Sequence, residues 1–491
     1  MKKIIYNIGT LAGILPTDVR RLEGEAMNHV ECIENAYLVI EDGIIAEFGE
    51  MSDSVFQDGM KDTVILNGTK DTVILNGMKD TVILNGTKDT VILNGTKWSE
   101  ESLCGRSFAD AQDDRQDDAQ DGRRSATQDG RLKDRQSEGQ EGNTEYIDAK
   151  GGFVMPAFCD SHTHIVYAGC RDGEFRDKIA GLSYEEIAAR GGGILNSADL
   201  LHETSEDELY RQSMERVNEI MAMGTGAVEI KSGYGLTVED ELKMLRVIRR
   251  IKETSPVTVK ANFLGAHAVG RAYRGRQAEY VDLVCNEMLP KVAEEGLADY
   301  VDVFCDAGFF TVEETARILE KAAEFGIRPK IHANELEVSG GVQVGVRYNA
   351  LSVDHLEKTT DAEIEVLRGS ETMPTMLPGC SFFLGLPYGR AKEYIQAGLP
   401  VALASDYNPG SSPSGNMRFV MALGCIRMRL TPEQSFNACT INSAYAMGVS
   451  DILGSITIGK KANLIITKPI PSLAFISYSH QTPIIEKIIL K

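Results

Sequence analysis

Two histidines one residue apart, His162 and His164, are the clearest sign of chemistry in this sequence. They follow an apolar run typical of a strand, and alternate residues of a strand point to the same side. Both imidazoles can therefore reach one point, whereas two histidines in a surface loop would have no common target. The pair predicts a site for a divalent metal ion.

Short apolar or β-branched segments predict the elements that would position such a site. They alternate with amphipathic stretches whose starts, at Thr237, Thr311 and Thr431, fit capping boxes or their Asp variant. The alternation predicts an α/β protein with a (β/α)8 TIM-like barrel. The expected strands are residues 153–158, 227–231, 257–264, 300–305, 328–332, 350–353, 372–376 and 400–404.

Polar residues with catalytic potential fall at the ends of these expected strands, which is where barrel enzymes carry their active sites. Five of the eight histidines of the chain do so. Each alone could be a satisfied core histidine, but their joint placement favours one site. The residues placed in this way are His162, His164, Tyr234, His267, His332, Glu335, His355 and Asp406.

Three imidazoles and one carboxylate form a ligand set suited to zinc or ferrous iron, with a position left for water. His162, His164, His332 and Asp406 would supply it. Such an ion lowers the pKa of its water to about 7. Glu335 lies three residues after His332 and could pass the proton of that water to a leaving nitrogen. The alternative role is an ordinary glutamate at a helix N-terminus.

The sequence resembles the amidohydrolase superfamily, over about residues 1–50 and 146–470. The H-x-H pair occurs across the superfamily, whereas the K-S-G-Y-G, G-A-H-A-V and D-Y-N-P-G-S-S-P runs are far more specific. The motifs that carry the resemblance are residues 160–164, 168–171, 229–235, 263–269, 330–335, 354–356 and 405–413.

The resemblance implies hydrolysis of the cyclic amide of 4-imidazolone-5-propanoate to N-formimidoyl-L-glutamate, a step of histidine degradation. It implies one divalent ion, zinc or iron, held by His162, His164, His332 and Asp406, and catalytic roles for Glu335, His355 and Asp406. Arg171 would offer a bidentate fork to the propanoate carboxylate. The substrate-binding residues that the resemblance implies are Arg171, Tyr234, His267, Glu335, Asn408, Gly410 and Ser411.

The flanks of the barrel predict a second, smaller domain. Residues 1–51, a return strand at 145–152 and residues 455–491 are expected to pair as a small β-sandwich built from both chain ends, beside a barrel at 153–454. Residues 52–144 are expected to be an insertion. It contains four copies of a nine-residue unit at 61–96, which could form a β-meander or a solenoid. A polar tract at 99–144 follows, which we expect to be disordered.

Composition limits the partners. The net charge of -21 argues against a nucleic acid or an anionic membrane surface, and no segment is apolar for long enough to span a bilayer. Nine scattered cysteines without a disulfide framework predict a reducing, cytoplasmic setting. We therefore expect a small-molecule substrate, and the resemblance allows a homodimer. Two alternatives stay open, namely a cytosine- or guanine-type deaminase and a non-catalytic barrel that carries a repeat interaction module.

Overall fold

The structure is a computed structural model of the chain, and it describes residues 1–51, 63–67, 73–76, 81–85, 91–94, 144–182, 186 and 192–490. The chain divides into two compact units. One unit joins residues 1–50 to residues 143–491, and the other holds residues 51–142. None of the helices in the described ranges is both long and apolar enough to cross a membrane.

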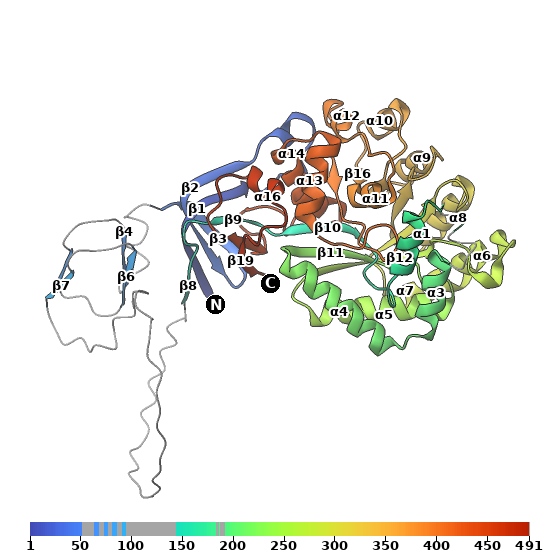
Figure 1. Cartoon of the computed structure of the whole chain (residues 1–491), viewed down its shortest axis with the longest axis horizontal. Coiled ribbons are helices and arrows are strands. Elements are labelled where there is room, and N and C mark those ends of the chain that lie inside the picture. The colour runs from blue at the N-terminus through green and yellow to red at the C-terminus, as the bar shows by residue number, and fades with distance from the viewer. Residues whose placement is uncertain are drawn as a thin grey trace, which may run out of the picture. The chain divides into compact units, whose positions relative to one another are not determined.

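Eight parallel strands form the centre of the larger unit. The last strand returns to the first through a bridge between Thr163 and Tyr407, so the sheet is nearly closed into a barrel (Figure 1). Its strands are β10 (Phe158–Thr163), β11 (Thr225–Lys231), β12 (Thr258–Ala266), β13 (Tyr300–Cys305), β14 (Arg328–Ala333), β15 (Ser352–His355), β16 (Met373–Met376) and β17 (Ala402–Leu403).

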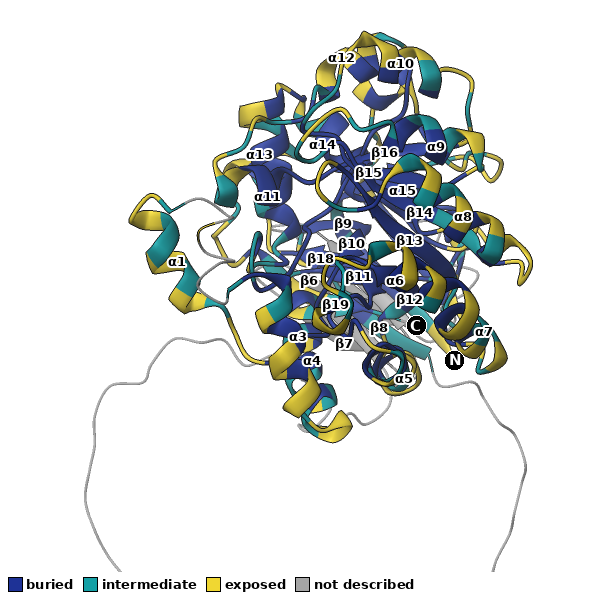
Figure 2. Ribbon diagram, turned by 90° about the vertical axis from the view of Figure 1, so that its right-hand side faces the viewer, coloured by how far each residue is buried: buried dark blue, intermediate teal, exposed yellow. Residues whose placement is uncertain are grey.

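Helices surround the strands, with buried faces against the barrel and exposed faces outward (Figure 2). The expected capping boxes at Thr311 and Thr431 are confirmed, and the Thr237 side chain accepts the backbone N–H of Asp240. The longer helices include α1 (Asp172–Ile179), α3 (Ile194–Glu203), α4 (Glu206–Ala222), α5 (Val238–Thr254), α8 (Val312–Ala323), α13 (Met417–Met428) and α14 (Pro432–Cys439). The shorter helices include α6 (Gln277–Leu283), α7 (Leu289–Glu294), α9 (Gly341–Arg347), α10 (Asp361–Leu367), α11 (Pro378–Leu384), α12 (Ala391–Gln396), α15 (Ile441–Ala446) and α16 (Ala474–Tyr478).

A mixed sheet joins the two ends of the chain beside the barrel (Figure 1). Its longest strand, β1, runs antiparallel to β2 and parallel to β8 and β9. Leu38, Val154 and Leu464 meet in a core of their own, so distant segments depend on one another for burial. The strands are β1 (Lys2–Ile14), β2 (Glu31–Glu41), β3 (Ile44–Glu50), β8 (Thr144–Asp148), β9 (Phe153–Pro156), β18 (Leu464–Thr467) and β19 (Ile485–Ile489). The expected fold class, a barrel with a small β domain from both chain ends, is confirmed, and the described strands of the expected β-sandwich lie in one seven-stranded mixed sheet.

The first barrel strand differs from its expected position. The expected strand at 153–158 divides at Pro156 into β9, which pairs with β1 and β18 of the mixed sheet, and β10, which begins the barrel. Proline has no N–H to continue a ladder, so it suits the end of a strand. His162 consequently lies within the first barrel strand and His164 directly after it, rather than both beyond its end.

The described strands of the nonapeptide array pair between alternate copies. β4 (Thr63–Asn67) is parallel to β6 (Thr81–Asn85), and β5 (Val73–Asn76) is parallel to β7 (Val91–Asn94), each pair in exact sequence register. A meander would pair neighbouring copies in antiparallel fashion, so this pattern favours the solenoid alternative. From residue 99 to residue 143, the tract expected to be disordered lies outside the described residues, and Thr144 already begins β8.

Candidate metal centre

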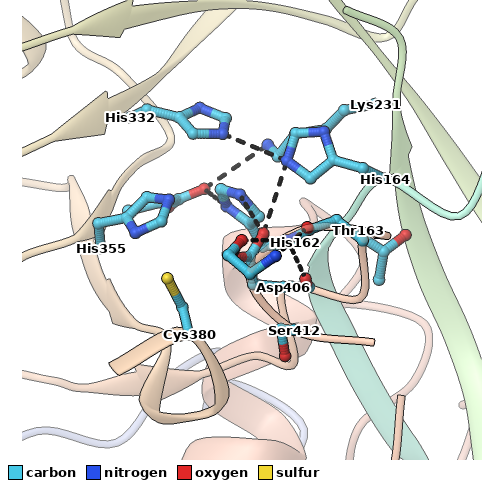
Figure 3. Close-up of polar contacts among 12 residues, drawn as sticks. His162, Thr163, His164, Lys231, His332, His355, Cys380, Asp406 and Ser412 are labelled. Carbon is cyan, nitrogen blue, oxygen red and sulfur yellow. Dashed lines mark hydrogen bonds and ion pairs between the residues drawn. The ribbon is translucent and has the colours of Figure 1, made fainter. Parts of the chain in front are cut away.

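Four side chains, from the end of β10, from β14 and from the segment after β17, converge at the carboxyl end of the barrel (Figure 3). The Nε2 atoms of His164 and His332 lie 3.4 Å apart. Oδ1 of Asp406 lies 3.7 Å from Nε2 of His162 and 3.6 Å from Nε2 of His164. All four residues are buried. Spacings of this size suit atoms that share one small cation, because the ligands of a tetrahedral zinc lie about 3.4 Å from one another.

The hydrogen bonds of the histidines leave their inner nitrogens available to a metal. Nδ1 of His162 lies 2.7 Å from Asp354, and Nδ1 of His332 lies 3.0 Å from Asp302. A proton on each Nδ1 would place a lone pair on Nε2. Nε2 of His162 is buried without a hydrogen-bond partner in the described structure. Lone pairs that face a buried carboxylate without a donor between them fit a cation at this point.

Burial keeps the histidines in the form that binds metal. It holds the pKa of His162 and of His164 well below the usual range, and it lowers the pKa of His332 to about 3. Burial also raises the pKa of Asp406 to about 6. Neutral imidazoles bind divalent ions, whereas imidazolium ions do not. The residues present therefore fit a metal on grounds of both geometry and charge.

A buried ionic network lies behind the histidines. Nζ of Lys231 donates to Glu229 at 2.6 Å and to Asp302 at 2.7 Å, and it lies 3.7 Å from Asp354. Burial opposes the charge of this ammonium, but the three carboxylates raise its pKa. Lys330 donates to the carbonyl of Ser161 at 2.8 Å and also pairs with Glu229. The network thus fixes the two aspartates that orient His162 and His332.

Glu335 and His355 form a charged pair beside the four candidate metal ligands. Oε2 of Glu335 lies 3.8 Å from Nε2 of His355. Burial raises the pKa of Glu335 to about 7, with smaller contributions from Glu357 and Asp406 against the opposing effect of His355. Burial acts against the charge of His355, but Glu335 and Glu357 raise its pKa to about 10. A carboxyl with a pKa near neutrality can both accept and return a proton.

Strained backbone accompanies these side chains. His355 and Asp406 have φ values of 86° and 55°, in the left-handed region that non-glycine residues seldom occupy. Asn334, which precedes Glu335, has a φ of 58°. Such conformations cost free energy and cluster where structure serves function.

A cavity of about 590 Å³ opens onto the convergent ligands. Its size is that of a small-molecule site. Phe175, Phe304 and Phe383 supply apolar walls, and His164, His332 and Asp406 form its floor. All seven residues expected from the sequence to bind substrate line this one cavity, namely Arg171, Tyr234, His267, Glu335, Asn408, Gly410 and Ser411.

Helix α1 and the loop after β17 meet at the rim of the cavity. The Arg171 guanidinium donates to Glu174 at 2.6 Å, and a Cβ on Gly410 would lie 2.2 Å from Nη1 of Arg171, so a side chain there would displace the guanidinium. Lys178 donates to the carbonyl of Gly410 at 2.7 Å. Ser411 Oγ in turn lies 3.2 Å from Oδ2 of Asp406. The rim is thus tied to a candidate metal ligand.

Comparison with known proteins agrees with this geometry. The profile of the Amidohydrolase family matches residues 153–489. An imidazolonepropionase of Flavobacterium johnsoniae is 60% identical over 344 residues, which cover 70% of this chain and 84% of that protein. An imidazolonepropionase of Geobacillus kaustophilus is 43% identical over 336 residues, which cover 68% of this chain and 78% of that protein. The chain belongs to the imidazolonepropionases of the amidohydrolase family.

Solved structures show the same fold at much lower identity. A triazine hydrolase variant aligns with a TM-score of 0.63 at 12% identity and covers 100% of this chain and 93% of its own. A guanine deaminase from C. acetobutylicum aligns with a TM-score of 0.61 at 12% identity, and the alignment covers 100% of this chain and 99% of the deaminase chain. These likenesses show the amidohydrolase fold alone, while the family assignment follows from the imidazolonepropionases.

Some residues of this imidazolonepropionase site were not singled out in the sequence. Asp302 carried a usable signal, because it is an acid within an otherwise apolar expected strand. Lys231 lay inside the K-S-G-Y-G motif, but nothing local tied it to Asp302, 71 residues away. Lys178 had no signal beyond its charge, since its position at the cavity depends on the path of α1.

Proposed function

We propose that this imidazolonepropionase-family hydrolase opens the cyclic amide of 4-imidazolone-5-propanoate to N-formimidoyl-L-glutamate, in the cytoplasm, with one divalent ion, zinc or iron. The observation that carries the proposal is the convergence of three imidazoles and Asp406 on one point of a cavity whose rim holds Arg171. The 60% identity to a named imidazolonepropionase favours this substrate.

The metal site that we propose consists of His162, His164, His332 and Asp406. An ion bound there would lower the pKa of a bound water to about 7 and so make it nucleophilic at neutral pH. The chain's own contribution is to keep the imidazoles neutral by burial and oriented by Asp302 and Asp354. Zinc and iron both suit this nitrogen and oxygen ligand set.

Proton transfer is assigned to Glu335, with His355 and Asp406 beside it. Attack of water on the ring carbonyl forms a C–O bond and then breaks the C–N bond of the amide. The water proton goes to the Glu335 carboxylate and then to the departing nitrogen, so the carboxylate is regenerated. His355, held protonated by Glu335 and Glu357, would polarise the carbonyl oxygen.

Substrate binding is assigned to the cavity wall. Arg171 would hold the propanoate carboxylate through a bidentate pair. Tyr234 and His267 would lie along the ring of the substrate. The loop formed by Asn408, Gly410 and Ser411 would place the rest of the molecule. This loop is pre-shaped, because Oδ1 of Asn408 accepts the backbone N–H groups of Gly410 at 2.8 Å and Ser411 at 2.7 Å.

We also propose the following division of the chain. Residues 1–51, 144–156 and 455–491 form the small β domain, residues 157–454 form the catalytic barrel, and residues 52–143 are an insertion without a part in catalysis. A homodimer is the assembly that we infer from the family resemblance. Sedimentation of the purified chain tests this assembly directly.

Product analysis tests the proposed reaction. Purified chain supplied with one equivalent of zinc or ferrous iron should consume 4-imidazolone-5-propanoate and form N-formimidoyl-L-glutamate without releasing ammonia. A deaminase would instead release ammonia from cytosine or guanine. Ammonia release from an aminated ring, with no turnover of the imidazolone, would overturn the proposal.

A further inference from the structure

A cysteine lies against the acid–base pair of the site. Cys380 is in the first turn of α11, and its sulfur is directed toward the His355 ring (Figure 3). The Cys380 thiol lies 3.7 Å from Oε1 of Glu335, and Nε2 of His355 lies 3.8 Å from Oε2 of Glu335. The candidate ligand atoms of the three residues all lie within 4.8 Å of one another. Cys380 and His355 are almost wholly buried.

This arrangement differs from that of an ordinary core cysteine. Leu377 and Ala404 pack against Cys380, as they would against any small apolar residue. Among the cysteines in the described part of the chain, however, Cys380 is the one that joins two other potential metal ligands in a group. A thiol, an imidazole and a carboxylate at this separation make up a ligand set typical of zinc.

We propose that Glu335, His355 and Cys380 form a second, inhibitory site for a thiophilic divalent cation such as Zn²⁺ or Cd²⁺. Sγ of Cys380 and Nε2 of His355 lie 3.7 and 3.8 Å from different oxygens of the Glu335 carboxylate, and both spacings are close to the roughly 3.5 Å expected between ligands of a tetrahedral zinc with one sulfur. A water can complete the coordination from the cavity, which Glu335 and His355 line.

Local charge favours a soft cation at this position. The carboxylates of Glu335, Glu357 and Asp406 act electrostatically on the thiol and outnumber the one positive charge of His355, and a divalent cation offsets the excess negative charge. Burial, together with these carboxylates, raises the pKa of the Cys380 thiol well above its usual range. Glu335 and Glu357 likewise keep His355 protonated. Metal binding therefore displaces two protons, one from the Cys380 thiol and one from the His355 imidazolium, and both pass to solvent as the metal–sulfur and metal–nitrogen bonds form. Hard ions such as Mg²⁺ bind sulfur too weakly to displace the thiol proton.

The second site borders on the first. Ligand atoms of His355 also lie within 4.8 Å of those of His162 and Asp406. Many enzymes hold two divalent ions about 3.5–4 Å from each other, with a carboxylate between them. The consequence rests on the proposed function: once its carboxylate binds the second ion, Glu335 can no longer carry a proton. The first equivalent of metal should activate the enzyme, and the second should inhibit it.

Cadmium titration of the full chain tests this site by a readout that does not depend on activity. The chain first receives one equivalent of Zn²⁺, and Cd²⁺ is then added while the ultraviolet cadmium–thiolate absorption, the bound-metal count and turnover are followed. We expect a second equivalent to bind with a thiolate band, and turnover to fall more than tenfold. Mg²⁺ at the same concentration should do neither.

Substitution of the thiol provides the decisive comparison. Cys380→Ala should retain turnover at one equivalent of Zn²⁺, lose the thiolate band of the second equivalent and resist inhibition. Cys380→Ser, which keeps the side-chain size, serves the same purpose if the alanine variant folds poorly. Cys170→Ala removes an exposed thiol near α1 and should behave like the parent chain.

Two results would overturn the inference. One is a second equivalent that binds to Cys380→Ala with the same thiolate band, and the other is the lack of any such band in the parent chain. If the band appears in the parent and vanishes in Cys380→Ala while no variant hydrolyses the imidazolone, the second site stands and the proposed function fails.

Discussion

The candidate ligands are held in place by different partners. His162 and His332 each direct Nδ1 toward a buried aspartate, whereas His164 stacks on His267, with ring centroids 5.2 Å apart and an angle of 17° between the planes. Carboxylate partners fix the orientation of an imidazole and raise its basicity toward metal. The ionic network around Lys231 therefore belongs to the function of the site as much as to its stability.

Replacement of Asp302 tests this dependence. Asp302→Asn should weaken metal affinity about 10- to 100-fold, because His332 loses a charged partner. Competition with a chromogenic chelator measures the affinity. Asp299→Asn is the matched control, since Asp299 pairs with Lys260 rather than with a ligand histidine, and it should bind metal normally. Equal affinities of the two variants would contradict the orienting role.

Replacement of Glu335 tests proton transfer. Glu335→Gln should retain one equivalent of metal but reduce kcat about 10²–10⁴-fold, because an amide cannot accept the water proton. KM should change little. Metal analysis and steady-state kinetics on the same sample give both quantities. Turnover near that of the parent chain would reject the assigned role.

At the scale of elements, α1 acts as a rim fastened by polar contacts rather than by a core. None of its residues is buried. Glu174 accepts from Arg171 and also from the backbone N–H of Gly193 at 3.0 Å, so it joins the helix to the segment before α3. Lys178 reaches the carbonyl of Gly410 and lies 4.8 Å from the centre of the Phe383 ring. The orientation of Arg171 thus depends on Glu174.

Replacement of Glu174 tests that dependence. Glu174→Gln should raise KM for 4-imidazolone-5-propanoate about tenfold, equal to about 1.4 kcal/mol, because the guanidinium loses its charged partner. The value of kcat should stay within a few-fold. An imidazolone without the propanoate tail should show no such rise. Asp172→Asn, in the same turn of α1, is the control, and an equal KM in both variants would contradict the positioning role.

Much of the fold and of the site could be predicted from local patterns. Polar residues just beyond apolar runs indicated His162, His164, His332 and Asp406, because barrel strands end at one common face. The division at Pro156 was missed, since a continuous apolar run does not reveal which of two sheets each half joins. The pairing of Lys231 with Asp302 could not be predicted, because it depends on how separate strands face one another inside the barrel.

For the molecule as a whole, the mixed sheet carries the connection to the inserted segment. Residues 51–143 connect β3 to β8, and both strands belong to this sheet rather than to the barrel. The register places Glu50 opposite Ala36, Ala36 opposite Ile8, and Thr144 opposite Lys2. The two strand ends are thus three strand spacings and about six residues apart, or about 25 Å.

Deletion of the insertion tests its dispensability. Replacing residues 55–143 by a Gly/Ser linker of about ten residues, which spans the gap, should leave kcat and KM within about twofold of the parent chain. No candidate site residue lies in the deleted segment. Circular dichroism of the shortened chain tests whether it folds. A folded variant with little activity would show that the insertion supports catalysis.

Metal dependence is the most direct test of the convergent site. Chain stripped by a chelator would be titrated with Zn²⁺ or Fe²⁺ while bound metal and turnover of 4-imidazolone-5-propanoate are measured together. The account predicts no turnover without metal, and a linear rise that reaches its maximum at one equivalent. His332→Ala, combined with Cys380→Ala to remove the second site, should lose this tight equivalent. Full turnover by the stripped chain, or one tightly bound equivalent in the double variant, would contradict the central claim.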